Sequence, residues 1–245
     1  MRIRKLLYAL PVLLLGVGAC NDEDKPTAPN NGIVGSGTPA TEVRTVAAFH
    51  SVNLSAVGDV TVLQGAPQTL RVTVDDNIIQ YITTTVTGGV LEIGETPGVD
   101  LDRYDLAVDV TMPDIQGLAV TGVGSIRSVN LLQVDTLTVN LSGVGTVILQ
   151  MAVAHLTSTL GGVASMLLDG SATTHEFTLS GDGSLGAFDL DTDTSRISIS
   201  GLGPAEVTAA DVLAVTISGS GTVYYKGTPT VNANITGTGQ IIDSN

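Results

Sequence analysis

The sequence has 245 residues, of which 24 are acidic and ten are basic, and a net charge of −14. A surface this acidic repels phosphate backbones, so nucleic acid is not an expected partner. Tryptophan is absent, aromatic residues make up 3% of the chain, and 29 positions are glycine. The remaining wealth of Val, Ile, Leu and Thr favours many short strands separated by glycine turns, and the expected fold class is all-β.

The first 20 residues are expected to be a secretion signal. Three basic residues within positions 1–5 precede an apolar run at 6–15, which is short for a membrane-spanning helix. Residues 17–20, Val-Gly-Ala-Cys, resemble the lipobox of bacterial lipoproteins, in which the cysteine is acylated and begins the mature chain. This resemblance implies that Cys20, the only cysteine, is lipidated. An ordinary signal with a chance cysteine is the alternative.

Removal of this signal would leave seven basic residues against 24 acidic ones, a net charge of −17. Residues 21–42 are expected to be a flexible tether, because prolines, glycines and charges occur there without hydrophobic periodicity. Acidic residues at 22–24 resemble the surface-export signals of some lipoproteins, and a solvated linker explains them equally well. The expected location is therefore the outer membrane or cell surface, with lipid anchoring, and a periplasm-facing location is the alternative.

Residues 43–245 are expected to form one repetitive domain. An apolar-x-apolar stretch, a small residue that is usually Ser or Thr, and Gly-x-Gly recur at intervals of 18 to 21 residues. A period of this length without a helical pattern predicts one β-coil per repeat, with two or three short strands, stacked into a solenoid. The first glycines of the copies are Gly122, Gly143, Gly162, Gly181, Gly201, Gly219 and Gly237.

The pattern also predicts the role of each position in a coil. Side chains alternate between the two faces of a strand, so every second apolar residue is expected in the core. The glycines are expected at a positive φ that other residues resist. The hydroxyls before them, spaced about 4.8 Å apart, are expected to form a hydrogen-bonded ladder. The expected core residues include Val139, Leu141, Phe177, Leu179, Val215 and Ile217.

Two stretches depart from the repeat. Residues 43–113 alternate less regularly, and Ser55–Val60 looks like a degraded copy, so this region is predicted to form the first coils or a cap. Pro204 follows one Gly-x-Gly phrase directly. Because proline has no N–H to donate, that coil is predicted to be locally irregular.

Several motifs are typical of binding sites on other folds. Gly181–Gly186 matches the dinucleotide fingerprint, but strand rather than helix is predicted after it, so nucleotide binding is not expected. The acidic runs Asp100–Asp102 and Asp189–Asp193 carry ligands suited to calcium, and solvated turn acids are the favoured interpretation. The three histidines are scattered and no carboxylate pair recurs between coils. No catalytic, metal-binding or cofactor-binding residue is therefore predicted.

The span from about residue 43 to 242 resembles a bacterial family known as putative auto-transporter adhesin, head GIN domain. The resemblance rests on residues 49–52, Phe-His-Ser-Val, on 58–62, Gly-Asp-Val-Thr-Val, on 74–78, Val-Asp-Asp-Asn-Ile, on 91–93 and 110–113, and on the Gly-x-Gly phrases. It implies a right-handed parallel β-helix at the cell envelope and supplies no catalytic residues.

The sequence thus predicts a non-catalytic, lipid-anchored envelope protein that displays a rigid β-solenoid for adhesion or scaffolding. Its expected partners are the membrane, through Cys20, and an envelope glycan or protein; no cofactor is expected. A glycan-binding or polysaccharide-acting β-helix protein is the alternative. The last coil, near residues 241–242, has no obvious polar cap, which leaves self-association open.

Overall fold

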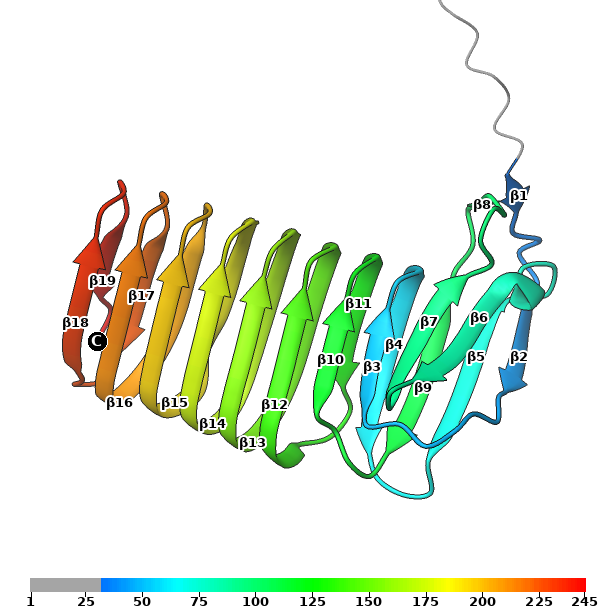
Figure 1. Ribbon diagram of the computed structural model, residues 1–245, viewed down its shortest axis with the longest axis horizontal. Helices are drawn as coiled ribbons and strands as arrows, with labels where there is room; N and C mark the ends of the chain where they lie inside the picture. Colours follow the sequence, from blue (N-terminus) through cyan, green and yellow to red (C-terminus); the bar gives the residue numbers. More distant parts are fainter. Residues whose placement is uncertain (1–31) are drawn as a thin grey trace, which may run out of the picture. The chain divides into compact units, whose positions relative to one another are not determined.

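Each central coil of the solenoid is one strand that runs from one Gly-x-Gly turn to the next. The computed structural model describes residues 32–245, which form one compact unit. β13 (Val144–Leu160) and β14 (Val163–Leu179) have 17 residues each and bend midway, so each strand passes along both faces of the solenoid (Figure 1). The parallel β-solenoid is confirmed, but each of these coils has two faces and one bend instead of separate short strands.

Parallel pairing in a constant register stacks the coils. Val144 pairs with Val163, and Val163 pairs with Asp182, so one coil is 19 residues long at this point. The other strands of the parallel stack pair with the strands of neighbouring coils in the same way. They are β3 (Ser51–Leu54), β4 (Val57–Gln64), β7 (Val90–Glu95), β9 (Ala107–Met112), β10 (Gly117–Val120), β11 (Val123–Ser128), β12 (Leu132–Leu141), β15 (Asp182–Ile199), β16 (Pro204–Ile217), β17 (Thr222–Lys226), β18 (Thr230–Ile235) and β19 (Gln240–Asp243).

Chain order and spatial order differ near the N-terminal end of the stack. β3 pairs with β10 on one side and with β7 on the other, and β4 pairs likewise with β11 and β9. The coil of β3 and β4 therefore lies between the coil of β7 and β9 and the coil of β10 and β11 (Figure 1). Val57 and Gly58 pair with Val123 and Gly124, which confirms that Ser55–Val60 is a copy of the repeat.

Antiparallel strands close this end of the solenoid. β5 pairs with both β9 and β2, β6 pairs with β7, and all three pairings are antiparallel. Ile78, Ile79 and Ile82, at the turn between β5 and β6, are buried and cover the core. Residues 43–113 thus provide both coils and a cap. The additional elements are β1 (Ile33–Val34), β2 (Pro39–Val43), β5 (Thr69–Asp75), the short 3-10 helix η1 (Ile79–Tyr81), β6 (Ile82–Thr87) and β8 (Leu101–Asp102).

The predicted flexible tether does not extend to residue 42. β2 pairs antiparallel with β5, and β1 pairs parallel with β8. Backbone pairing therefore orders residues 33–34 and 39–43, although their sequence lacks hydrophobic periodicity. Residues 21–31, the signal at 1–20 and Cys20 lie outside the described residues. Between residues 32 and 245 no helix has the length and apolar character needed to cross a membrane.

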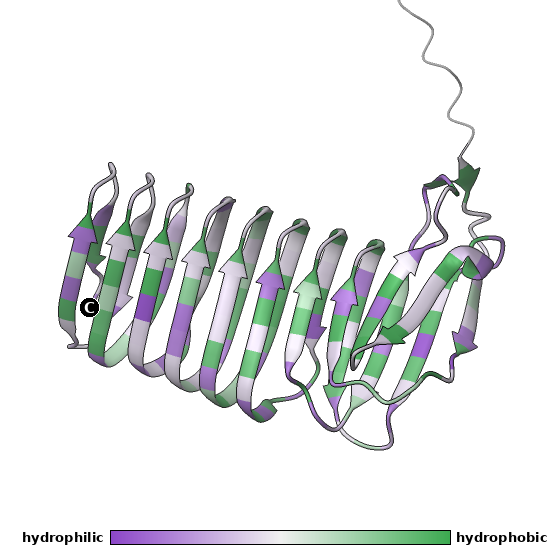
Figure 2. Cartoon of the chain, viewed as in Figure 1, coloured by the Kyte–Doolittle hydropathy of each residue, from purple (hydrophilic) through white to green (hydrophobic). Residues whose placement is uncertain are grey.

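Alternation along the strands builds the core (Figure 2). The expected inward residues are all at most 2% exposed, which confirms the register predicted from the sequence. Each large apolar side chain buried in this way contributes on the order of 1.5–3 kcal/mol. The residues are Val139, Leu141, Phe177, Leu179, Val215 and Ile217.

The turn glycines are needed mainly because the coils stack closely. Gly143 is not at a positive φ, so that expectation is wrong for the first glycine of its copy. A Cβ there would lie 1.9 Å from the Gly122 carbonyl oxygen of the preceding coil, which no side chain tolerates. The second glycine of the same copy, Gly145, has a φ of 156°, and its Cβ would lie 1.8 Å from the Gly124 carbonyl oxygen.

The ladder between turns is made by the backbone and not by the hydroxyls. The N–H groups of Ser142 and Gly143 both donate to the Val120 carbonyl, at 3.1 Å, and this pattern recurs in the following coils. The hydroxyl of Ser200 instead lies 3.5 Å from the Leu179 carbonyl that it faces. The predicted hydroxyl ladder is therefore wrong: the residues that carry these hydroxyls are exposed, and within residues 32–245 none of them bonds to the corresponding hydroxyl of the next coil.

The coil that contains Pro204 is irregular, as predicted. Its ladder with β15 begins at Leu185 and Ala205, one position after the proline. A second irregularity lies further along the same pair of strands, where the register shifts between Ala187 and Asp191. Proline does not explain this shift; β15 has 18 residues and β16 has 14, so extra residues are accommodated there.

Candidate functional site

The residue that follows the first glycine of each copy, or the alanine that replaces this glycine at position 56, points outward at the tip of the turn. Register places Val57 beside Val123, Val123 beside Val144, and Val144 beside Val163. Adjacent strands of a sheet lie about 4.8 Å apart, so these side chains form a continuous row. We call this row the apical ridge. Its aliphatic members are Val57, Val123, Val144, Val163 and Leu202.

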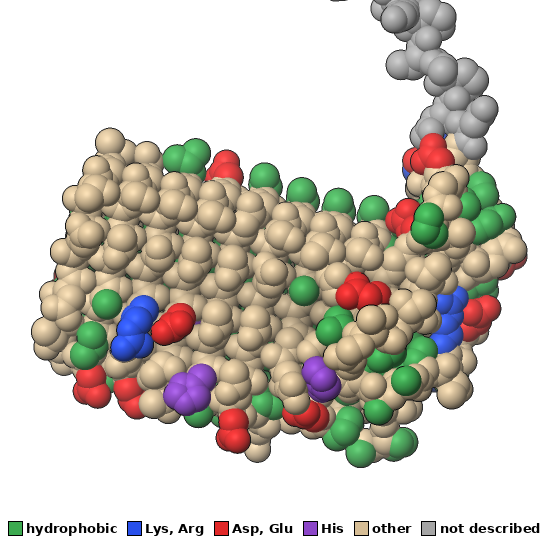
Figure 3. Space-filling view, viewed as in Figure 1, with side chains coloured by type: hydrophobic (Ala, Val, Ile, Leu, Met, Phe, Trp, Pro, Cys, Tyr) green, Lys and Arg blue, Asp and Glu red, His purple; other side chains and the backbone are tan. Residues whose placement is uncertain are grey.

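The apical ridge is unusually exposed for aliphatic residues. Its five members are 45–60% exposed, and Figure 3 shows hydrophobic side chains in a row along this edge. Asp182 takes the same position between Val163 and Leu202, so one carboxylate interrupts the row. Single exposed apolar residues are ordinary on protein surfaces, but aligned ones are typical of a contact surface.

A hollow of about 410 Å³ lies on the face that leads away from the ridge. Ile148, Leu167 and Gly186 occupy the same outward position in successive coils, and Glu206 follows them. Gly186 therefore leaves a gap in a row of side chains, and a Cβ there would lie 2.7 Å from Leu167 Cδ2. The gap is the origin of the hollow, because the neighbouring coils carry large residues.

Charged and aromatic groups border this hollow. Lys226 is the one lysine among residues 32–245, and its Nζ lies 4.3 Å from the centre of the Phe188 ring. This cation–π contact covers one face of the ring. The hollow thus offers an aliphatic wall, a partly covered aromatic ring, the ammonium and the Glu206 carboxylate.

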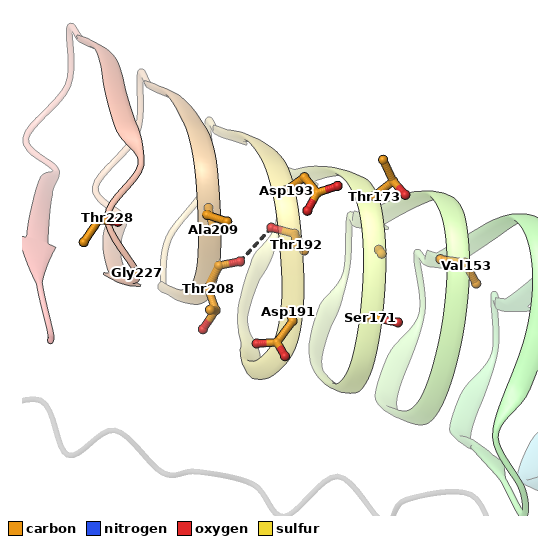
Figure 4. Close-up of a pocket in the computed structure, with 12 residues that line it drawn as sticks. Val153, Ser171, Thr173, Asp191, Thr192, Asp193, Thr208, Ala209, Gly227 and Thr228 are labelled. Carbon is orange, nitrogen blue, oxygen red and sulfur yellow. Dashed lines mark hydrogen bonds between the residues drawn. The ribbon is translucent and has the colours of Figure 1, made fainter.

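A second hollow, of about 450 Å³, lies at the bend where β15 and β16 lose register (Figure 4). Thr192 is buried there, and its hydroxyl donates to the Thr208 carbonyl at 2.6 Å. The carboxylates of Asp191 and Asp193 lie apart on the outer side of this bend. Across residues 32–245 no three His, Cys, Asp or Glu side chains are grouped closely enough to hold a metal ion.

One serine–histidine pair lies in the core. The Oγ of Ser158 and the Nε2 of His175 are 2.7 Å apart, which is the contact expected of a nucleophile and its base. Both residues are at most 1% exposed, however, so no substrate reaches them. Burial lowers the pKa of His175 to about 4, which keeps the ring neutral. This pair belongs to the core and is not a catalytic site.

The remaining sequence motifs are not brought together. His50 lies before β3 and His155 lies on β13, where its Nδ1 is 2.8 Å from the Thr174 hydroxyl. Gly181–Gly186 forms a turn and the start of β15, with no helix after it, so the structural context of a dinucleotide site is missing. Cys20 lies outside the described residues, and its lipidation stays a prediction.

Sequence reasoning missed both the apical ridge and the buried pair. The ridge had a visible signal, since the residue after the first glycine is Val in three plain copies and Leu in another. The buried pair had a weaker one: Ser158 stands at an inward position that is Val139 in the preceding coil. A valine after a glycine, or a serine within a strand, does not reveal a surface row or a buried pair until the register of the coils is known.

The fold and the surface together define a parallel β-solenoid with repeated glycine turns, an aliphatic edge and an antiparallel cap. The family model described as "Putative auto-transporter adhesin, head GIN domain" matches residues 48–229, well over half of the chain. The chain belongs to this family. A search of the curated proteins finds no match.

Solved structures of bacterial proteins share the fold. A putative adhesin from Bacteroides fragilis NCTC 9343 is 25% identical, with a TM-score of 0.84 over 87% of this chain and 100% of that one. A putative lipid binding protein from Parabacteroides distasonis ATCC 8503 is 24% identical, with a TM-score of 0.73 over 87% and 99%. A putative adhesin from Parabacteroides merdae ATCC 43184 is 22% identical, with a TM-score of 0.65 over the same shares. Adhesin-like relatives point to an adhesion-like role at the cell surface or envelope.

Proposed function

We propose that this protein is a non-catalytic adhesion protein of the bacterial envelope and that the apical ridge is its contact surface. The exposure of five aligned aliphatic side chains on one edge is the observation that carries the proposal. A rigid backbone of stacked coils holds these side chains in one row, so a partner meets them without first ordering them. Membership of an adhesin-like family supports the same role.

Lipid anchoring through Cys20 is the second part of the proposal. The lipobox-like residues at 17–20 support it, since an acylated cysteine would hold the solenoid at a membrane. We expect Cys20→Ser to move the protein from the membrane fraction to the soluble fraction of lysed cells, measured by immunoblotting. A variant that stays in the membrane fraction would contradict the anchoring.

The contact surface is tested by a triple substitution in the ridge, Val123→Ser, Val144→Ser and Val163→Ser. Beads that carry residues 32–245 are mixed with cells of the source bacterium that lack the protein, and bound beads are counted. A valine removed from water contributes on the order of 1.5 kcal/mol, which is roughly tenfold in binding. We therefore expect the triple variant, which lacks three valines, to adhere at least roughly tenfold less than the wild type.

The matched control carries serine on neighbouring coils but on the broad face: Asn140→Ser, Thr159→Ser and Thr178→Ser. These residues pair in register with one another, as the ridge residues do. We expect the control to adhere as the wild type does. Equal losses in both variants, or adherence of wild-type beads no better than that of bare beads, would overturn the proposal.

Glycan binding is the competing function, and the hollow beside Gly186 is where it would occur. Sugar sites combine an aromatic face with charged and polar groups, and Phe188, Glu206 and Lys226 supply these types. One face of Phe188 is covered by Lys226, however, which leaves less ring surface for a sugar. The ridge is therefore the preferred contact surface. If Phe188→Ala abolishes adherence and the triple ridge variant still adheres, glycan binding would be favoured.

A further inference from the structure

The two ends of the solenoid are built differently. At the N-terminal end, β2 covers β5, and the Arg44 guanidinium donates to the carbonyls of Ile79 and Ile82 at 2.9 and 2.6 Å. These contacts occupy backbone groups that a further strand would need. At the C-terminal end, β18 and β19 each pair with one neighbour only, β16 and β17 respectively. At the N-terminal end β2 and β6 also pair with one neighbour each, β5 and β7, but both are antiparallel cap strands. Only the C-terminal end therefore stops on unpaired strands of the parallel coils themselves.

The backbone ladder stops with an open acceptor at this edge. The Ile217 carbonyl accepts from the N–H groups of Thr236 and Gly237, at 2.9 and 3.2 Å. The corresponding carbonyl of the last coil, that of Ile235, accepts no hydrogen bond from any residue between 32 and 245. The N–H and C=O of one residue in a strand point to the same side, and those of alternate residues to opposite sides. Ala233 and Ile235 therefore direct both groups away from the solenoid.

The core is also open at this end. Leu213, Val215 and Ile217 of the preceding coil are at most 2% exposed. Val231 and Ile235, which occupy the same inward positions in β18, are 37% and 41% exposed. The side chains differ little in type, so the difference arises because, within residues 32–245, no strand lies against the outer edge of β18. A strand laid against β18 would bury this surface and complete the ladder in one step.

The low charge of the C-terminal end indicates which kind of chain can pair with it. Residues 230–245 contain a single charged residue, Asp243, in a chain that has 24 acidic residues. Two copies of so acidic a protein repel one another over most of their surfaces, and the repulsion is smallest at this nearly neutral end. The edge strands also lack lysine, which natural edge strands often use to prevent pairing.

We propose that two copies of this chain join end to end through β18 and β19. A two-fold axis that passes through both faces of the last coil sets β18 antiparallel to β18 of the partner and β19 antiparallel to β19 of the partner. Inward residues remain inward under this rotation, so the two cores become continuous. Because the other end is capped, the assembly closes as a dimer and does not extend into a filament.

Sedimentation equilibrium of residues 32–245 tests the proposal. We expect twice the chain mass in the wild type and the chain mass in Ile235→Lys, which places a charge at the open core, and in Ala233→Pro, which removes a free N–H. Thr216→Lys, one coil earlier and in register with Asn234, adds the same charge to the broad face and should remain dimeric. Wild-type protein that is monomeric at every concentration, or that forms larger polymers, would overturn the proposal.

Hydrogen exchange of the wild type locates the interface without any substitution. We expect the exchange of peptides from β18 and β19 to slow as protein concentration rises, while exchange in β12 and β13 stays constant. A dimer whose β18 exchanges equally fast at all concentrations would use another surface, and that result would overturn the proposal even if Ile235→Lys failed to fold.

Discussion

His175 and Ser158 occupy core positions that the preceding coil fills with an apolar side chain, Leu156 and Val139 respectively. Ser158 pairs in register with Val139 on one side and Phe177 on the other. The small serine leaves room beside the larger phenylalanine, and His175 fills that room and bonds the hydroxyl at 2.7 Å. The Nδ1 of His175 has no partner among the described residues, so the ring is tolerated only while it is neutral.

This burial makes stability depend on pH. Burial lowers the pKa of His175 to about 4, below its ordinary value of 6.5. Between these two pH values the unfolded chain binds the proton and the folded chain does not, so the free energy of unfolding falls as pH falls. One residue with this shift accounts for about 3 kcal/mol lost between pH 7 and pH 4. We expect His175→Leu to remove this part of the pH dependence, measured by urea unfolding.

His155→Leu is the matched control, because the ring of His155 is exposed on the adjacent coil. It should retain the wild-type decline in stability between pH 7 and pH 4. A His175→Leu variant with the same decline as the wild type would show that other groups cause it.

At the scale of elements, the stacked turn is the unit that limits sequence change. A side chain at Gly143 would meet the Gly122 carbonyl oxygen at 1.9 Å, so adjacent coils would have to separate and break the backbone ladder. We expect Gly143→Val to lower the free energy of unfolding by about 3 kcal/mol or more, measured by urea unfolding. Ser142→Val, at the exposed neighbouring position, should change it by less than about 0.5 kcal/mol.

Elements with a local signal were predictable, and those that depend on distant pairing were not. The 18-to-21-residue period and the alternation of Val139 and Leu141 specify coils and an inward face directly. The cap lacks such a signal, because β2 is ordered only through its pairing with β5, about 30 residues away. The position of the β3–β4 coil between two later coils likewise depends on pairing that no local pattern encodes.

The candidate site was less predictable than the fold. The repeated glycines are visible in the sequence itself. The exposed side chains of Val123, Val144 and Val163, in contrast, form a surface only because the register aligns them. The hollow beside Gly186 likewise depends on its neighbours, since a lone glycine predicts no gap until Leu167 and Glu206 stand on either side. Signals of this kind appear only when the coils are stacked.

At the scale of the whole molecule, acidity and the ridge have complementary roles. Repulsion between acidic surfaces opposes contact between copies everywhere except at the nearly neutral C-terminal end, so the aliphatic side chains on one edge remain available for contact with a partner. In the proposed dimer, rotation about the two-fold axis carries the second ridge to the opposite edge. If both proposals hold, one dimer would present two contact surfaces that face away from each other and would bridge two partners.

The most direct test of the ridge as contact surface is to complete it. Asp182 interrupts the row between Val163 and Leu202, and Asp182→Val would make the row continuous, whereas Asp182→Asn would remove the charge alone. In the bead assay, we predict that the valine variant adheres more strongly than both the wild type and the asparagine variant, with an increase of roughly tenfold for one further buried valine. Adherence of the valine variant no greater than that of the asparagine variant would contradict the account.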